Sequence, residues 1–293
     1  MRVLITGCHG QVGYCLTKQL AKQESNEVLA LDKDHLDITN QEAVNATVKE
    51  FQPTIIINAA AHTAVDKAEE QVDLSYAINR DGPKFLAQAA QDCGAAILHI
   101  STDYVFEGNK LGEYEETDET NPQGVYGKSK LAGEHAVAKA CQRHIILRTA
   151  WVFGENGNNF VKTMLRLGAT RDALSIVRDQ FGGPTYAGDI ADALIQIATR
   201  IEKGDEVEYG IYHYSGLPHV SWYEFAKSIF DKADEFGITT KKPSLTSITT
   251  DQYPTPAKRP SNSRLSTNKI NDVFSIKASD WQAALNNIKA YTE

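Results

Sequence analysis

The chain has 293 residues, of which 42% are hydrophobic and 23% are charged, a composition typical of a globular protein. Its formal net charge is −8, and Lys and Arg nowhere cluster among aromatic residues, so nucleic acid is excluded as the main partner. No apolar run approaches the roughly 18 residues that a membrane helix needs, and the first residues lack the apolar stretch of a signal peptide.

The cysteines point to a reducing compartment. Cys8, Cys15, Cys93 and Cys141 show no CxxC spacing and no paired histidines. We therefore expect reduced thiols and no metal site. Together with the missing export and membrane signals, this pattern predicts a cytoplasmic protein.

In the first half of the chain, short β-rich runs alternate with amphipathic helical stretches. Strands are expected at 3–6, 28–32, 54–58, 96–102 and 145–149, and helices at 11–23, 43–51, 74–92 and 126–141. This alternation is typical of βαβ units. We predict an α/β fold in which residues 1–150 form a Rossmann-type, doubly wound parallel sheet that binds a dinucleotide.

After residue 150 the pattern loosens. It favours helices at 160–170 and 188–200, a strand at 174–177, and a proline-rich stretch at 253–260. We expect residues 151–173 and 201–293 to form a smaller, mixed α/β substrate lobe, with 174–200 returning to the first domain. Ligands of open α/β sheets lie outside the carboxyl ends of the strands, so this lobe would cover the crevice and select the substrate.

A glycine-rich turn follows the first expected strand. Gly7, Gly10 and Gly13 allow the pyrophosphate of a dinucleotide to approach the backbone at a helix N-terminus. Asp32 ends the next expected strand, 19 residues beyond Gly13, where a carboxylate accepts hydrogen bonds from the adenosine ribose. This carboxylate favours NADH over NADPH, whereas the neighbouring Lys33 softens the repulsion of a 2′-phosphate, so both cofactors stay open.

A tyrosine and a lysine form the candidate catalytic pair. Tyr126 and Lys130 are four residues apart on an expected helix and therefore share a face, whereas Lys128 faces away. An ammonium beside a phenol lowers the phenol's pKa from about 10. Tyr126 would then donate a proton in step with a hydride transfer.

Polar residues close two of the expected strands. Thr102 and Asp103 follow Ser101 at the end of the fourth strand, where a hydroxyl could bind a substrate carbonyl; alternatively, the cluster only forms a turn. Asn58 is followed by three alanines, which suit close helix packing or the approach of a cofactor. His62 comes next and is either a ligand contact or a structural hydrogen bonder.

These segments together resemble the extended short-chain dehydrogenase/reductase family. The longer strings G-Q-V-G, A-A-H-T-A-V-D-K-A-E, S-T-D-Y-V-F-E-G, R-T-A-W-V-F-G and R-P-S-N-S-R-L are similar to the dTDP-4-dehydrorhamnose reductases within it, from Met1 to about Leu265. The resemblance implies reduction of the 4-keto group of dTDP-4-dehydro-β-L-rhamnose by NADPH or NADH, the final step of dTDP-L-rhamnose synthesis.

The resemblance also implies roles for matching positions. The pyrophosphate would contact Gly10, Gln11 and Val12, and the rest of the cofactor would lie along Asp32, Asp37, Ile38, Ala61, His62, Thr63, Tyr126 and Lys130. Thr102, Tyr126 and Lys130 would be catalytic. The nucleotide sugar would contact Thr102, Asp103, Trp151, Arg259 and Asn262, although Asp37 could cap a helix and Arg259 could form a surface ion pair.

One position departs from the family. Some members are described as dimers that share a magnesium ion through glutamates, one of them in the first helix, where this chain has Cys15. Magnesium prefers oxygen ligands. We therefore expect no metal-bridged dimer through Cys15, and both a monomer and a homodimer stay open.

Other functions also fit the pattern. A nucleotide-sugar epimerase or dehydratase of the same family would recycle its cofactor. The regulatory β subunit of methionine adenosyltransferase resembles these reductases without catalysing their reaction. An interaction protein with an incidental nucleotide fold would have no need of Thr102, Tyr126 and Lys130.

Overall fold

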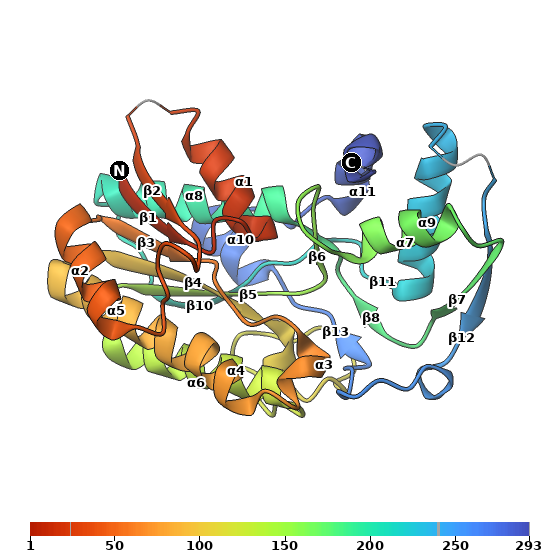
Figure 1. Ribbon diagram of the computed structural model, residues 1–293, viewed down its shortest axis with the longest axis horizontal. Coiled ribbons are helices and arrows are strands. Elements are labelled where there is room, and N and C mark those ends of the chain that lie inside the picture. The colour runs from red at the N-terminus through yellow and green to blue at the C-terminus, as the bar shows by residue number, and fades with distance from the viewer. Residues whose placement is uncertain (24, 239–240, 293) are drawn as a thin grey trace.

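The computed structural model describes residues 1–23, 25–238 and 241–292, and a parallel sheet is its largest element (Figure 1). Within these residues, six strands follow the order β10-β5-β4-β3-β1-β2, with every pair parallel. They are β1 (Arg2–Thr6), β2 (Glu27–Leu31), β3 (Ile55–Asn58), β4 (Ala96–Thr102), β5 (His144–Thr149) and β10 (Gly210–His213). The five strands predicted before residue 150 are confirmed, each within one residue at either end.

Helices cover both faces of this sheet (Figure 1). One face carries α1 (Gln11–Leu20), α8 (Ala187–Lys203) and α10 (Asn268–Phe274); the other carries α2 (Gln41–Phe51), α5 (Gly82–Cys93) and α6 (Val125–Ala140). Strands between two helical layers must be apolar on both sides, and Leu4 and Ile5 are fully buried on opposite faces. The predicted Rossmann-type α/β fold is confirmed.

The strand order reverses beside β1. The chain passes from β1 to β2 on one side, then crosses back to β3 on the other. In open α/β sheets, ligands bind outside the carboxyl ends of the strands at such a reversal. The turns after β1 and β3 therefore flank the expected dinucleotide site.

The long helix expected at 74–92 is interrupted. It consists of α4 (Val72–Tyr76), a π-helical turn (Ala77–Asp81) and α5. Pro83 at the start of α5 has no N–H, so it cannot donate to the carbonyl of Asn79 four residues earlier. Helix α6 comes close to this turn at Gly133, where a Cβ would lie 2.0 Å from the Asn79 carbonyl oxygen.

A smaller lobe lies beyond the carboxyl ends of β4 and β5 (Figure 1). Its core joins α7 (Phe160–Gly168) and α9 (Trp222–Glu235) to a parallel pair of strands, β7 (Ala173–Val177) and β12 (Ser244–Ile248). Its other elements are β6 (Val152–Phe153), β8 (Phe181–Gly182), β9 (Thr185–Tyr186), β11 (Val220–Ser221), β13 (Asn262–Ser263), α11 (Trp281–Ala284) and a 3-10 segment (Leu285–Tyr291).

Two details of the expected division are wrong. Residues 174–200 do not return to the main sheet as one piece, because β7 pairs with β12 of the smaller lobe and only α8 covers the main sheet. Residues 201–293 do not belong wholly to the smaller lobe, because β10 pairs with β5 and α10 packs on the same sheet. The short β10, G-I-Y-H, carries too weak a pattern to be separated from its surroundings by sequence.

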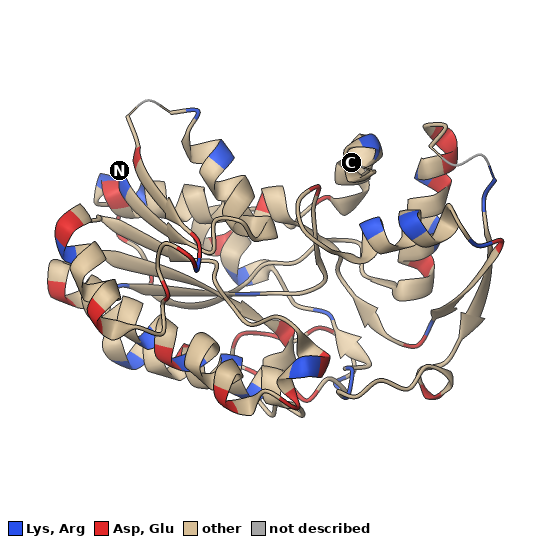
Figure 2. Ribbon diagram, in the orientation of Figure 1, with Lys and Arg blue, Asp and Glu red and all other residues tan. Residues whose placement is uncertain are grey.

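Charged residues of both signs are spread over the helices and loops, and few lie on the strands of the main sheet (Figure 2). The strands of the main sheet are therefore free to pack apolar side chains against the helices on both faces. None of the helices in the described ranges is both long and apolar enough to cross a membrane.

Candidate active site

The turn after β1 forms a cradle that only glycine permits. Gly7 has a φ of +75°, and a Cβ there would lie 2.7 Å from the backbone nitrogen of Ala60, after β3. A Cβ on Gly13 would lie 2.1 Å from the Gly7 carbonyl oxygen. Helix α1 begins after Gly10 without a side-chain cap. Its N-terminal N–H groups therefore suit an anion such as a pyrophosphate.

Gln11 and Val12 are the other residues predicted to contact the pyrophosphate, and in both the side chain is already engaged elsewhere. Val12, in the first turn of α1, points into the core, which leaves only its backbone for a ligand. The Gln11 side chain turns toward the smaller lobe, where its Oε1 accepts a hydrogen bond from Nδ2 of Asn159 at 3.0 Å. From the same loop, Nδ2 of Asn156 donates to the carbonyl of His9 at 3.0 Å. Sequence reasoning missed this contact between the loop and the glycine-rich turn, because the two segments are more than 140 residues apart.

Asp32 lies just past β2 and contacts two histidines that sequence reasoning missed. Its oxygens lie 2.9 Å from Nδ1 of His9 and 2.7 Å from Nδ1 of His35. Backbone N–H groups of Asp34 and His35 also donate to it. The hydrogen bond with His35 holds the pKa of Asp32 below its ordinary value and raises the pKa of His35.

Asp37 and Ile38 are held by local structure. The Asp37 carboxylate accepts hydrogen bonds from the N–H and the hydroxyl of Thr39, at 2.9 and 2.7 Å. Asn40, and not Asp37, caps α2 by accepting from the N–H of Ala43. Ile38 is buried against Gly82, so its side chain belongs to the core.

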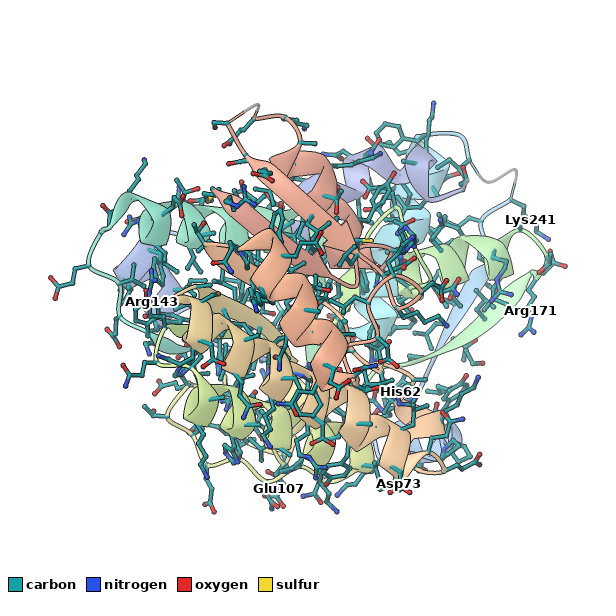
Figure 3. All side chains as sticks on the ribbon, turned by 60° about the vertical axis from the view of Figure 1, so that its left-hand side comes forward. His62, Asp73, Glu107, Arg143, Arg171 and Lys241 are labelled. Carbon is teal, nitrogen blue, oxygen red and sulfur yellow. The ribbon has the colours of Figure 1, made fainter. Side chains whose placement is uncertain are left out.

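The loop after β3 carries Ala61, His62 and Thr63. Nδ1 of His62 lies 3.0 Å from the hydroxyl of Ser75, and Asn79 bonds both the N–H and the carbonyl of His62. Burial, with Lys67 nearby, lowers the pKa of His62. Figure 3 shows His62 on the side of the main domain that faces the smaller lobe, while Thr63 is exposed to solvent.

Thr102 and Tyr126 meet at the carboxyl end of β4. Tyr126 lies in the first turn of α6, close enough to Thr102 for that side chain to lower the Tyr126 pKa against the larger effect of burial. Gly127 permits this approach, because a Cβ there would lie 2.2 Å from the Tyr104 carbonyl oxygen. The Tyr104 ring packs edge-on against Tyr126, with 5.4 Å between centroids.

Lys130 lies one turn further along α6 and is buried. Its Nζ donates to the carbonyl of Ile100 at 2.7 Å, and burial lowers its pKa to about 8, opposed by the nearby Glu134 carboxylate. Burial raises the pKa of Tyr126, and the charged neighbour that contributes most is Asp103. The predicted lowering of the Tyr126 pKa by Lys130 is therefore wrong for this structure, since desolvation is the larger effect.

Two further buried carboxylates adjoin this set. Asp103 accepts from the Thr102 hydroxyl at 3.1 Å, and burial raises its pKa to about 6. Glu134, which sequence reasoning missed, accepts from the Ser101 hydroxyl at 2.5 Å and pairs with Arg148 at 2.7 Å. This ion pair fixes α6 against β4 and β5, and with it the position of Lys130.

A cavity of about 930 Å³ opens between the smaller lobe and the carboxyl end of β4. Trp151 lines it and stacks on Trp222 with 3.5 Å between ring centroids. Trp151 has a φ of +50°, an unusual conformation for a bulky residue that is found mainly at functional sites. Arg171 also lines the cavity, at the outer end of the smaller lobe near the ion pair of Lys241 with Asp172 (Figure 3).

The two predicted substrate contacts from the R-P-S-N-S segment behave differently. Arg259 lines the cavity, where it pairs with Asp66 of α3 (Val65–Ala68) at 2.6 Å. Asn262 is buried, its Nδ2 donates to the carbonyls of Lys110 and Gly112, and its Oδ1 accepts from Arg264. The substrate contact predicted for the Asn262 side chain is wrong, because its hydrogen-bonding capacity is already filled.

A dinucleotide cradle, a hydroxyl pair at a strand end, a buried lysine and an adjoining cavity together define an oxidoreductase of the extended short-chain dehydrogenase/reductase class. Residues 1–292 match the family described as RmlD substrate binding domain. A dTDP-4-dehydrorhamnose reductase of Aggregatibacter actinomycetemcomitans is 54% identical over 292 residues, which cover 100% of this chain and 99% of that protein.

Solved structures agree with this match. The crystal structure of a dTDP-4-dehydrorhamnose reductase of Clostridium acetobutylicum is 44% identical with a TM-score of 0.90, covering 99% of this chain and 98% of that one. The enzyme of Bacillus anthracis, in complex with NADP, is 38% identical with a TM-score of 0.91 and 98% coverage of each chain. The chain belongs to the dTDP-4-dehydrorhamnose reductase family, and the resemblance seen in the sequence is confirmed.

Proposed function

We propose that this protein reduces the 4-keto group of dTDP-4-dehydro-β-L-rhamnose to the alcohol of dTDP-β-L-rhamnose, with NADPH or NADH as the reductant. The observation that carries the proposal is that Tyr126 and buried Lys130, one turn apart on α6, lie against the carboxyl end of β4, where Thr102 adjoins Tyr126, and that Tyr104, which packs on the Tyr126 ring, lines the cavity. Family membership supports the choice of sugar, because the closely similar relatives are named for this reaction.

The residues present fit a dinucleotide. The contacts that Gly7 and Gly13 make leave no room for side chains in the turn, and α1 begins uncapped. Gly10, Gln11 and Val12 would hold the pyrophosphate through their backbone, and Asp32 would face the adenosine ribose. Ala61, His62 and Thr63 would lie further along the cofactor. When bound, the dinucleotide supplies the hydride.

Tyr126 would supply the proton. A raised pKa keeps the phenol protonated at neutral pH, which is the state that a proton donor requires. Thr102 would donate a hydrogen bond to the 4-keto oxygen of the sugar, the atom that Tyr126 protonates, and so hold this oxygen within reach of Tyr126. Lys130, whose pKa is about 8, is still mostly charged at pH 7, and its ammonium would stabilise the phenolate left after the transfer.

The cavity would hold the nucleotide sugar. Trp151 offers an aromatic face, and the guanidinium of Arg259 suits a diphosphate because its donors match pairs of oxygens. Asp103, beside Thr102, would contact a sugar hydroxyl. We propose that residues 151–186, 214–238, 241–263 and 275–292 form the substrate lobe, while α8, β10 and α10 belong to the dinucleotide domain.

The test is an assay of the purified protein with dTDP-4-dehydrorhamnose made in situ, which follows the absorbance of reduced nicotinamide. We expect NADPH or NADH to be oxidised in equal amount to the sugar reduced, with dTDP-L-rhamnose identified by NMR. Sugar conversion without net consumption of reduced cofactor would indicate an epimerase or dehydratase instead. Cofactor binding without any turnover would indicate a regulatory homologue.

The proposed setting is the cytoplasm. The four cysteines, Cys8, Cys15, Cys93 and Cys141, are free thiols, as a reducing compartment maintains them. Cys15 on α1 is partly buried, which raises the pKa of its thiol to about 11 and keeps it protonated. The enzyme would act as a monomer or a homodimer.

A further inference from the structure

We propose that His9 and His35 are specificity-determining residues that let the adenosine site accept the 2′-phosphate of NADPH despite the carboxylate of Asp32. The inference rests on the proposed function, because it assumes that a dinucleotide binds in the glycine cradle. It adds two residues to the site and predicts how the choice between NADPH and NADH depends on pH.

The two imidazoles occupy both oxygens of one carboxylate. Nδ1 of His9 lies 2.9 Å from one oxygen of Asp32, and Nδ1 of His35 lies 2.7 Å from the other. His9 comes from the glycine-rich turn itself, between Gly7 and Gly10, whereas His35 comes from the loop after β2. The carboxylate is thus bracketed by groups from the two segments that would enclose an adenosine ribose.

The side chains of both histidines are far more exposed to solvent than that of Asp32. The His9 and His35 side chains are 76% and 72% exposed, compared with 14% for Asp32. A phosphate entering from solvent therefore meets the imidazole edges before the carboxylate.

The charge of this cluster depends on those imidazoles. Asp32 and Asp34 are negative and Lys33 is positive, and the thiol of Cys8 behind Asp32 is neutral because burial and Asp32 raise its pKa. With neutral imidazoles the cluster carries a net charge of −1, which repels a phosphate. With both protonated it carries +1, and two charged N–H donors become available.

The preference for NADPH should therefore increase as the pH falls. The hydrogen bond that His35 donates to the Asp32 carboxylate raises the pKa of His35, so this imidazole gains its proton at a higher pH than a free one. A phosphate monoester carries nearly two charges at pH 7 and begins to lose one near pH 6. His35 therefore gains its proton at a pH at which the phosphate is still mostly dianionic, above about pH 6.5.

The experiment measures the dissociation constants of NADPH and NADH by calorimetry at pH 8 and pH 6.5. It uses the wild type, the single variants His9→Gln and His35→Gln, and the double variant. Glutamine keeps a hydrogen-bonding amide near Asp32 without a titrating charge. The control is His135→Gln, an exposed histidine on α6 outside this cluster. Melting temperatures verify that each variant is folded.

In the wild type and in His135→Gln, we expect the affinity for NADPH relative to NADH to rise about tenfold from pH 8 to pH 6.5. Each single variant should lose part of this rise, and the double variant should lose all of it. A ratio that does not change with pH in the wild type would overturn the inference, as would a rise that persists in the double variant. Failure of the wild type to bind either dinucleotide would instead refute the proposed function.

Discussion

Asn159 donates a hydrogen bond from Nδ2 to Oε1 of Gln11, 3.0 Å away. The same side chain caps α7, because its Oδ1 accepts from the N–H of Lys162 at 3.1 Å. Helix α7 supplies residues to the sugar cavity, and Gln11 opens α1 at the dinucleotide cradle. One amide therefore joins the two regions that would bind the two ligands.

The variant Asn159→Ser should separate these two roles. Serine still caps a helix but is too short to reach Gln11. We expect the melting temperature to stay close to that of the wild type, while the strengthening of dTDP binding by bound cofactor falls about fivefold. Calorimetric titration of dTDP with and without NADPH measures this effect. Equal strengthening in variant and wild type would show that the contact does not couple the sites.

The glycine-rich turn allows a matched comparison. Gly13→Ala would bring a methyl group to 2.1 Å from the Gly7 carbonyl oxygen, whereas the methyl of Gly10→Ala would lie 3.2 Å from the same atom. We expect Gly13→Ala to lose about 1–3 kcal/mol of stability together with cofactor binding. Gly10→Ala should keep its stability and lose affinity, because its methyl group would face the ligand. Urea unfolding and NADPH titration distinguish the two, and equal stability of both variants would contradict this packing.

Cofactor affinity should depend on the protonation of Lys130. Because burial lowers the pKa of Lys130 from 10.5 to about 8, the ammonium is present below pH 8 and is lost as the pH rises above it. We expect the ammonium also to bind the nicotinamide ribose, so the dissociation constant of NADH should rise by up to about tenfold per pH unit above pH 8. Lys130→Met should bind weakly at every pH and turn over little.

The control for this prediction is Lys128→Met, on the exposed side of the same helix. It should show the pH dependence of the wild type. An NADH affinity that Lys130→Met leaves unchanged would contradict the ribose contact.

Substitutions at two positions of the R-P-S-N-S segment should differ in effect, one acting on substrate binding and the other on stability. Arg259→Met should raise the KM for the keto-sugar about tenfold at nearly unchanged stability, because Arg259 lines the cavity and its partners are partly exposed Asp66 and, at 3.3 Å, the Tyr104 hydroxyl. Asn262→Ala should instead lose about 1–2 kcal/mol of stability, because it removes the buried amide that donates to two partly buried carbonyls. Steady-state kinetics and thermal unfolding of both variants provide the check, and the reverse pattern would restore Asn262 as a substrate contact.

The features that could be predicted from the sequence are those encoded by local, periodic patterns within one segment of the chain. Each apolar run of the first 150 residues is bounded by turn residues, so the strands of the main sheet up to β5 could be located closely. Gly7, Gly10 and Gly13 and the spacing of Tyr126 and Lys130 are likewise patterns within a single segment. Such patterns survive folding because the neighbours along the chain remain neighbours in space.

What the sequence could not predict depends on contacts between distant segments. The π-helical turn needs Pro83, but also Gly133 of α6 to approach it. His9 meets Asp32 only because the turn after β1 lies beside the end of β2. The effect of burial on Tyr126 was missed because its desolvation comes from residues far along the chain, whereas the spacing of Lys130 is visible at once.

The most direct test of the proposed chemistry is the turnover of Tyr126→Phe beside its affinity for the cofactor. Removing one hydroxyl removes the proton donor and leaves the ring packing against Tyr104 intact. We predict that kcat for the keto-sugar falls about 10²- to 10⁴-fold while the dissociation constant of NADPH changes less than about threefold. Turnover near that of the wild type would contradict the assignment of Tyr126 as the acid.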